Sequence, residues 1–504
     1  LKGSLNQIDG YAIIKKIIPR EGLNMSYLDS IKAFTTEQVV KLIVNSLRNV
    51  SDETIIKLTY LAEKLTPIEY YRDQIRGLRQ MFEEKRPQII LARKVLQETH
   101  PNVREKLMVN VIVRSILLGV PKRQKLEKEL GCQVPFFFVV SPTMRCNLNC
   151  YGCYAGQYRK ESDMPIELMD RIFTEAKEMG MNFLTISGGE PFIRKEHLDL
   201  FEKHSDMSFQ IYTNGTLIDR NLAKRLAQMG NVYPAISMEG YEEETDARRG
   251  KGTFKRVMEA MEALRDEGVL FGFSITATRQ NTELVSSDEF MDFLISKGCS
   301  FGWYFTYVPI GKKPDMNLMP TPEQRIHLRN QVHKLRYEKP IFIGDFWNDG
   351  PYVGGCIAGG RRYFHINNSG DVEPCVFCHF TVDNIKNKSL KEAFSSPFFR
   401  AIQERQPYDN NLMRPCMLID VPETLREVVE KYGARPSHEG ADSLVTELKD
   451  SVDEYAQAFK KLADEIWERD YKGTIYYKDY KTERQEYLRK LEEEASKKQE
   501  KARV

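Results

Sequence analysis

The N-terminal part of the chain carries apolar residues at helical spacing. Thr35-Thr36-Glu37-Gln38 has the pattern of a capping box that starts a helix, and Thr66-Pro67-Ile68-Glu69 is a second box with proline at the first helical position. Residues 108–120 form a further apolar stretch. These patterns predict a helical region over residues 1–133. Its apolar stripes are best explained by packing between helices; the alternatives are a lid, a partner surface or a membrane-facing surface.

From about residue 134 the pattern changes to short apolar runs, each followed by polar or glycine residues and then a helical segment. The runs are residues 136–140, 183–186, 209–212, 232–236, 271–275 and 303–307. This alternation indicates parallel strands joined by right-handed crossovers. Six such units are too few for a closed eight-unit barrel. We therefore predict an α/β fold whose core, residues 134–340, is a partial (βα)6 barrel.

The remainder of the chain divides into two regions of different residue composition. After a third capping box, Thr321-Pro322-Glu323-Gln324, residues 341–420 are rich in glycine and cysteine and predict a small cluster-binding domain. Residues 421–504 predict a helical C-terminal extension. Its charged end, residues 481–504, is interpreted as a solvated helix, with a docking arm as the alternative.

Composition narrows the function classes. The chain has 504 residues with 74 Lys and Arg against 72 Asp and Glu, so nothing favours nucleic-acid binding. No apolar stretch approaches the roughly 18 residues of a spanning helix, and the first residues lack a signal pattern. Nine cysteines without a secretion signal indicate a reducing, cytoplasmic setting, with peripheral contact at the inner face of the membrane as an addition. Seven of the nine lie in two groups, which favours metal ligation over disulfides.

The first cysteine group is Cys146, Cys150 and Cys153. Three thiolates cannot complete a tetrahedral zinc site, which needs four ligands. They can hold three irons of a 4Fe–4S cluster and leave the fourth iron open to a small molecule. A zinc knuckle or unconnected thiols are the alternatives from the spacing alone.

Polar motifs fall where the predicted strands end, which is where parallel folds collect their reactive groups. The first strand leads into the cysteine loop. The following three strands end in Ser187-Gly188-Gly189-Glu190-Pro191, in Thr213-Asn214-Gly215, and in Ser237-Met238-Glu239-Gly240 with Asp246, Arg248, Arg249 and Gly250 just after. Each motif alone could be a turn.

Taken together, the Cys-x3-Cys-x2-Cys loop, the Gly-Gly-Glu-Pro motif and the Ser-x-x-Gly…Asp-x-x-Arg-Gly motif resemble the radical S-adenosylmethionine (SAM) superfamily. The resemblance covers roughly residues 134–310. It implies a 4Fe–4S cluster and SAM as cofactors. It also implies an enzyme that cleaves SAM to a 5′-deoxyadenosyl radical and removes hydrogen from an unactivated C–H bond. A flavodoxin- or ferredoxin-type reductant is the expected electron donor.

The resemblance also implies roles for single residues. Gly188 and Gly189 let the backbone approach the amino acid end of SAM, and Glu190 accepts a hydrogen bond from its amine. Ser237 and Arg249 hold its carboxylate, a role that suits the always-charged arginine fork. Thr213 and Asn214 line the ribose side. Gly152 stands where the family often has an aromatic residue, so Tyr151 or Tyr154 is expected to pack on the adenine.

The second cysteine group is Cys356, Cys375, Cys378 and Cys416. Residues 363–367, a turn at Asn368-Ser369-Gly370 and residues 371–376 predict a β-hairpin beside these cysteines. The segment resembles the auxiliary-cluster region of SPASM or twitch domains. Four cysteines rather than the usual seven favour one auxiliary 4Fe–4S cluster, closer to a twitch, for electron transfer or scaffolding. A four-cysteine zinc site is the alternative, and Cys132 and Cys299 are expected to be buried thiols.

Acids, bases and aromatic residues near this group suggest substrate contacts. The candidates are Asp345, Asp349 and His365, the last with the alternative of a strand residue whose side chain is hydrogen-bonded.

Three classes of substrate and function remain open from the sequence. A lipid or other long hydrophobic chain is slightly favoured, because of the apolar stretch at 108–120 and a general similarity to radical SAM proteins that alter membrane lipids. A peptide or protein, as in SPASM-type maturases that form thioethers, C–C bonds or formylglycine, is the alternative. A non-enzymatic electron-transfer protein is disfavoured, since an electron carrier needs no pocket for SAM.

Overall fold

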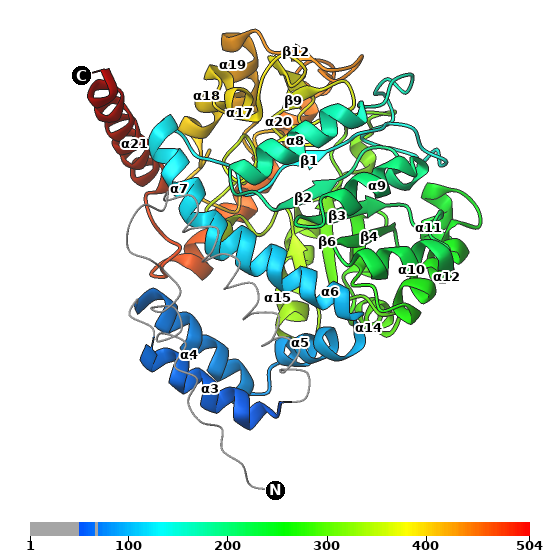
Figure 1. Ribbon diagram of the computed structural model, residues 1–504. Coiled ribbons are helices and arrows are strands. Elements are labelled where there is room, and N and C mark those ends of the chain that lie inside the picture. Colours follow the sequence, from blue (N-terminus) through cyan, green and yellow to red (C-terminus); the bar gives the residue numbers. More distant parts are fainter. Residues whose placement is uncertain (1–49, 66–68, 504) are drawn as a thin grey trace, which may run out of the picture.

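The computed structural model describes residues 50–65 and 69–503 (Figure 1). The capping boxes expected at Thr35–Gln38 and at Thr66–Ile68 therefore lie outside the described residues. The N-terminal region is helical, as predicted. Its elements are α3 (Asp52–Leu65), α4 (Glu69–Glu83), α5 (Pro87–Glu98), α6 (Pro101–Lys106), the π-helical η1 (Leu107–Leu118) and α7 (Gly119–Leu130). Helices α3 and α4 pack on each other at one end of the molecule in Figure 1.

The centre of the molecule is a parallel sheet. Its strands are β1 (Val139–Val140), β2 (Phe183–Ile186), β3 (Ser208–Thr213), β4 (Val232–Met238), β5 (Gly272–Ala277), β6 (Phe301–Thr306) and β7 (Phe342–Asp345). They pair side by side in chain order and all run parallel. The six predicted strands and the α/β fold class are confirmed. Strand β7 adds a seventh parallel strand, so the sheet continues past residue 340.

Helices connect the parallel strands. They are α8 (Ile166–Glu178), α9 (Glu196–Lys203), α10 (Arg220–Met229), α11 (Glu242–Arg249), α12 (Thr253–Asp266), α13 (Thr282–Val285), α14 (Asp288–Ser296) and α15 (Pro322–Glu338), with short 3-10 turns η2 (Pro191–Ile193) and η3 (Met316–Leu318). The predicted capping box at Thr321 is confirmed: its hydroxyl accepts the Gln324 amide N–H, and the Gln324 side chain accepts the Thr321 N–H. Both orphan donors are thereby satisfied where α15 begins.

The cluster-binding region joins the same sheet at its other edge. Strand β8 (His365–Ile366) lies parallel to β1, and β9 (Asp371–Glu373) lies antiparallel to β8, which confirms the predicted hairpin. Strand β11 (Asp383–Asn384) extends this edge, while β10 (Phe380–Thr381) pairs with β12 (Arg435–Pro436). The helices here are α16 (Gly350–Val353), α17 (Leu390–Phe394) and α18 (Pro397–Arg405). The chain between β7 and β8 thus passes from one side of the parallel sheet to the other.

The C-terminal extension is helical, with α19 (Pro422–Tyr432), α20 (Lys449–Ile466), the π-helical η4 (Trp467–Tyr471) and α21 (Tyr480–Arg503). Helix α21 packs on α7, where Leu488 and Leu491 are buried and the Tyr487 hydroxyl lies 3.4 Å from a carboxylate oxygen of Glu127. Much of its surface is exposed. The tail is therefore a docked helix with a solvated outer face, which combines the two interpretations of the sequence.

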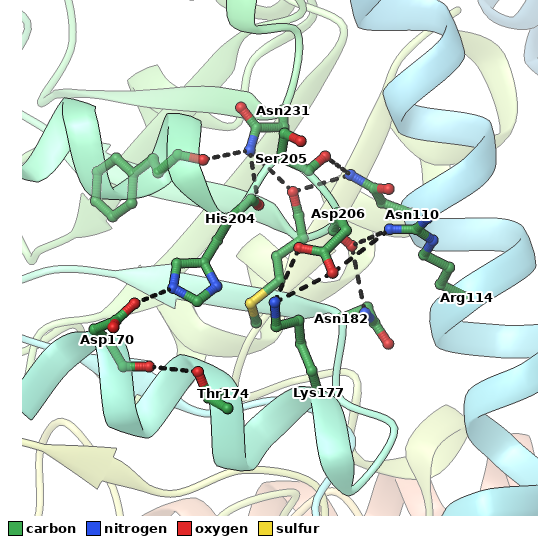
Figure 2. Close-up of polar contacts among 12 residues, drawn as sticks. Asn110, Arg114, Asp170, Thr174, Lys177, Asn182, His204, Ser205, Asp206 and Asn231 are labelled. Atoms are coloured by element: carbon green, nitrogen blue, oxygen red, sulfur yellow. Dashed lines mark hydrogen bonds and ion pairs between the residues drawn. The ribbon is translucent and has the colours of Figure 1, made fainter. Parts of the chain in front are cut away.

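Helix η1 is held against the sheet by polar contacts (Figure 2). The side-chain amide of Asn110 donates to the carbonyls of Ser205 and Met207, at 3.1 and 2.9 Å. Arg114 of the same helix donates to the Asp206 carbonyl at 3.2 Å. The loop that contains Ser205 and Met207 directly precedes β3. The apolar stretch at 108–120 therefore docks at the amino end of β3, about 17 Å along the strand from Thr213 at a rise of about 3.3 Å per residue.

The same stretch exposes apolar side chains on its outer face, at Ile112, Ile116, Leu117 and Leu118. Among the described helices, none combines the length and the apolar character that a membrane span requires.

Candidate functional site

A cavity of about 370 Å³ opens at the centre of the sheet. Alternate residues of neighbouring strands line it, as expected when one face of a pleated sheet curls around a space. The alternating strand residues are Val139, Phe183, Thr185, Gln210, Tyr212, Ser237, Ser274, Thr276, Trp303 and Phe305, and Thr213 and Thr306 join them at the ends of β3 and β6. The side chains between them, such as Phe209, Ile211 and Phe273, are fully buried in the core on the other face. The six predicted strands thus all contribute to the wall of the cavity.

The three cysteines of the first group, Cys146, Cys150 and Cys153, line one end of this cavity. Their loop is held by the motif that follows β2. The Gly189 N–H donates to the Thr143 carbonyl at 2.9 Å, and the Glu190 N–H donates to the Arg145 carbonyl at 2.8 Å. A Cβ on Gly189 would overlap the Arg145 carbonyl. Glycine is thus needed for close contact with the loop that carries the cysteines.

Gly188 has a second reason to be glycine. Its φ of 116° is a conformation that residues with a side chain rarely adopt, and a Cβ there would overlap the Thr143 carbonyl. Both glycines also line the cavity. The close approach to SAM expected from the sequence remains a prediction, beside this observed role in shaping the loop.

The donor set of the cysteine loop fits an iron–sulfur cluster with an open iron. Of the described residues that line the cavity, Cys146, Cys150 and Cys153 supply sulfur, and no histidine or fourth cysteine joins them. Within residues 50–65 and 69–503, no three His, Cys, Asp or Glu side chains are placed to hold a single metal ion. A cubane cluster instead binds each thiolate to a different iron, so its cysteines stand further apart than the ligands of one ion.

Glu190 is fully buried and lies outside the cavity wall. One carboxylate oxygen accepts the Phe192 N–H at 3.0 Å and the Thr213 hydroxyl at 2.8 Å, and the other accepts the Asn214 N–H at 2.8 Å. Burial raises the pKa of Glu190, against these hydrogen bonds. In the structure, Glu190 connects the end of β3 to the motif after β2. Its contact with the SAM amine remains a prediction.

The end of β3 reaches the cysteine loop. Thr213 and Asn214 both line the cavity. The Asn214 side-chain amide lies 3.7 Å from the Cys146 sulfur and donates to the Asn147 side chain at 2.9 Å. Asn214 therefore positions the first cysteine, in addition to the ribose contact expected from the sequence.

An arginine pair lies across the cavity from these residues. Arg248, Arg249 and Ser237 line the wall. The buried Glu239 carboxylate accepts from Arg249 Nε at 2.8 Å and pairs with Arg248 at 2.7 Å. This carboxylate fixes both guanidinium groups, a role that was not predicted for Glu239. Its place two residues after Ser237, at the end of β4, was the available signal.

Of the two tyrosines near the third cysteine, one lines the cavity and the other does not. The Tyr151 side chain is 44% exposed, donates to Asp315 at 3.0 Å and does not line the cavity, whereas Tyr154 does and its hydroxyl lies 2.7 Å from that of Ser187. A Cβ on Gly152 would touch the ring of Tyr307, another cavity residue. Tyr307 thus occupies the space beside Gly152, where the family often has an aromatic side chain.

The second cysteine group lies behind the aromatic part of the cavity wall. Burial is the largest cause that raises the pKa of Cys375, Cys378 and Cys416. Neighbouring thiols raise each pKa further, and for Cys416 the charge of Asp420 acts ahead of them. Cys356 is among the thiols that act on Cys375 and Cys416. The fold therefore brings all four predicted cysteines into one buried region. Cys132 and Cys299, which belong to neither cysteine group, are buried thiols, as expected.

The three predicted substrate contacts are not brought to the cavity. Asp345 is buried at the end of β7, where it accepts from the Asn348 side chain at 2.8 Å, and Asp349 pairs with Arg336 at 2.8 Å. His365 is fully buried in β8, 2.7 Å from the Ser141 hydroxyl and 2.6 Å from Glu373. These contacts match the hydrogen-bonded strand residue that was the alternative for His365.

The other end of the cavity is aromatic, a feature that was not predicted. Its walls come from the chain before β1, from β2 and β6, from the segments after β7 and before β8, and from the chain beside Cys378. The aromatic residues are Phe136, Phe137, Phe183, Trp303, Phe305, Phe346, Tyr363 and Phe377. The alternation of Trp303 and Phe305 with Tyr304 in one strand was the available signal.

Two models of known protein families match segments that contain the two cysteine groups. The model of the radical SAM superfamily matches residues 140–284, and that of the SPASM iron–sulfur cluster-binding domain matches residues 356–417. A Fe-coproporphyrin III synthase of Methanosarcina barkeri is 29% identical over 42% of this chain and 56% of its own length. The mycofactocin maturase MftC of Mycolicibacterium smegmatis is 29% identical over 55% of this chain and 75% of its own.

A structural relative is SuiB of Streptococcus suis, solved with S-adenosylmethionine bound. The match covers 57% of this chain and 72% of that chain, with 21% identity and a TM-score of 0.48.

Proposed function

We propose that this chain, which carries a radical SAM domain and a SPASM domain, cleaves SAM reductively and removes a hydrogen atom from a C–H bond of a peptide substrate. The two domains imply 4Fe–4S clusters. The observation that carries the proposal is the single cavity that joins the three cysteines at one end to an aromatic chamber at the other. When bound, the first cluster and SAM would supply the 5′-deoxyadenosyl radical, the hard chemistry of the reaction.

The chain's own residues would bind and orient SAM at the cysteine end. Arg249 is a fixed, always-charged donor that suits the SAM carboxylate, because Glu239 holds its Nε and one terminal nitrogen while the residue lines the cavity. Ser237 and Asn214 supply polar groups beside it. Tyr154 and Tyr307 are the aromatic rings available to the adenine.

The aromatic chamber would hold the reacting part of the substrate and keep water away from the radical. Ligand pockets are typically apolar with a few placed polar groups, and here Gln210, Ser274 and Thr276 supply the polar groups. Exclusion of water protects reactive intermediates from side reactions.

A peptide fits the site better than the other substrate classes. The cavity of about 370 Å³ is at the small end of the range of ligand pockets and has to hold SAM as well. A cavity of this volume suits one side chain or a short segment of a peptide better than a tetrapyrrole macrocycle, such as the one in the name of the Fe-coproporphyrin III synthase. MftC is named a maturase, which agrees with a peptide substrate.

The lipid substrate that the sequence slightly favoured gains no support from the relatives. The apolar stretch at 108–120 that suggested it docks at the amino end of β3, opposite to the end that carries Asn214 and the cysteine loop. A flavodoxin- or ferredoxin-type protein remains our proposal for the reductant.

The proposal is tested by following deuterium from substrate into 5′-deoxyadenosine. Anaerobically reconstituted, reduced protein is incubated with SAM and with peptide, lipid or tetrapyrrole fractions of a deuterated cell extract. We expect deuterium from the peptide fraction, and none with the C146A/C150A/C153A variant. Deuterium from the lipid or tetrapyrrole fraction alone would overturn the peptide assignment. A wild-type protein that holds iron yet does not cleave SAM would overturn the enzyme assignment.

A further inference from the structure

Tyr363 belongs to both halves of the site. It lies just before β8 and is 1% exposed. Its ring is part of the wall of the aromatic chamber. Its hydroxyl lies 2.8 Å from the sulfur of Cys375, in the second cysteine group. Among the described side chains that line the cavity, that of Tyr363 hydrogen-bonds a cysteine of the second group.

The direction of this hydrogen bond follows from the chemistry of a cluster ligand. A cysteine that binds iron does so as a thiolate, which carries no proton. The phenol must then be the donor.

The ring of Tyr363 is held in place by the chamber wall. Phe137 stacks on it with ring centroids 5.3 Å apart and planes 8° apart. Phe346 packs its edge against it at 5.9 Å. Because interiors are close-packed, a change in the wall at Phe137 is felt by the ring and by the hydroxyl that it carries.

We propose that Tyr363 is a positioning residue that links the wall of the substrate chamber to the auxiliary cluster and sets the reduction potential of that cluster. The proposal rests on the second cluster assigned above. A hydrogen bond to a cluster sulfur stabilises the more negative, reduced state and so raises the reduction potential. The contact with Phe137 makes this hydrogen bond depend on the shape of the chamber.

The test is a redox titration of the auxiliary cluster in the full-length C146A/C150A/C153A background, followed by electron paramagnetic resonance. Tyr363→Phe removes the hydroxyl and keeps the ring, and we expect a lower midpoint potential at unchanged iron content. Tyr408→Phe is the matched control. Tyr408 is a buried tyrosine near Cys356 whose hydroxyl lies 3.4 Å from the Met417 sulfur instead of a cysteine. We expect no shift from it.

A second pair of variants tests the link to the chamber. Phe137→Leu removes the ring stacked on Tyr363, and we expect a shift in the same direction as for Tyr363→Phe. Trp303→Phe changes another wall residue, whose ring packs on Phe342, and we expect no shift. Equal potentials in wild type and Tyr363→Phe would overturn the inference. A background protein that binds no iron would instead overturn the cluster assignment on which it rests.

Discussion

Arg325 and Asp420 form an ion pair whose two side chains are completely buried. Arg325 lies on α15 of the barrel, and Asp420 follows the cysteine Cys416. The same carboxylate accepts the Cys416 N–H at 3.0 Å, and the guanidinium lies 3.8 Å from the centre of the Phe459 ring on α20. One ion pair thus joins the barrel, the cysteine region and the C-terminal extension.

Breaking this ion pair is expected to destabilise all three parts. Arg325→Met leaves the Asp420 carboxylate buried and unpaired, which typically costs about 3–5 kcal/mol. We expect a matching fall in the free energy of unfolding, measured by urea denaturation, and a loss of iron from the second cysteine group. Replacing both partners, as in R325M/D420L, should recover part of the stability, because an apolar pair leaves no lone charge.

Lys334→Met is the control on the same helix. Lys334 pairs with Asp288 at the surface, with side-chain exposures of 45% and 33%. Such pairs contribute about 0–1 kcal/mol. A loss from Lys334→Met equal to that from Arg325→Met would contradict the special role of the buried pair.

Gly189→Ala is expected to disturb the cysteine loop. The added Cβ would overlap the Arg145 carbonyl, next to Cys146, and the backbone of the loop has to shift. Overpacking of this kind costs about 1–3 kcal/mol. We expect the iron content to fall towards that of a single cluster, with SAM cleavage reduced more than tenfold. Iron analysis and 5′-deoxyadenosine formation measure the two effects.

The control for that variant is Gly77→Ala in α4, where an added Cβ meets nothing within 4 Å. A helix interior gains about 0.5–1 kcal/mol from this exchange, so iron content and activity should be unchanged. Normal iron binding by Gly189→Ala would show that the loop tolerates the shift, and our account of the motif would be wrong.

Arg249→Lys is expected to weaken SAM binding while the cluster stays intact. A lysine has one ammonium group and cannot pair with Glu239 and face the cavity with a planar fork at once. We expect the Kd for SAM to rise about tenfold, equivalent to about 1.4 kcal/mol, in anaerobic calorimetry at unchanged iron content. Arg256→Lys, an exposed position on α12, is the control. An unchanged Kd for Arg249→Lys would remove this residue from the SAM site.

The stability of the protein should carry a pH signature from Asp345. Burial, and then the charge of Asp349, raise the pKa of Asp345 to about 6, against about 3.9 in an unfolded chain. Between these values the folded state keeps a proton that the unfolded chain has released. This contribution to stability is therefore fully present below about pH 4 and is lost as the pH rises through about 6.

Asp345→Asn cannot titrate, so its stability relative to wild type should rise between about pH 4 and pH 6 and stay level above pH 7. Urea midpoints of the two proteins at four pH values measure the difference. A difference that does not change with pH would show that Asp345 has an ordinary pKa.

The triple variant C146A/C150A/C153A is expected to lose one cluster and all SAM cleavage. The three thiolates that it removes are the proposed ligands of the reactive cluster. Cys299→Ala removes a fully buried thiol that belongs to neither group and should keep both clusters. The measurement is iron and sulfide per chain together with 5′-deoxyadenosine formation. SAM cleavage by the triple variant would mean that the cysteine groups are assigned to the wrong roles.

The parts of the structure that follow local patterns were predictable from the sequence. The strand runs, the capping box at Thr321 and the hairpin before Cys375 each depend on residues close together in the chain. Strand β7 was not predicted, since its apolar run is only three residues long, Ile341 to Ile343, and is followed by Gly344.

The side-chain partners were beyond the reach of sequence patterns. The Glu190 carboxylate accepts hydrogen bonds from Thr213 and Asn214, which lie more than twenty positions away in the chain. His365 contacts Ser141, which is more than two hundred positions away. A density of polar residues shows that contacts form but not which ones. The aromatic chamber was missed for the same reason, because Phe137 and Tyr363 meet only after β8 pairs with β1.

The pairing of β8 with β1 also has a kinetic consequence. Strand β1 leads into the first cysteine loop and β9 leads to Cys375, and both belong to one continuous sheet. A hinge motion between the two groups would therefore have to break the pairing of β8 with β1. An electron that passes between them would tunnel across a constant gap. The rate of that step should then be insensitive to solvent viscosity, unlike transfer by a swinging carrier domain.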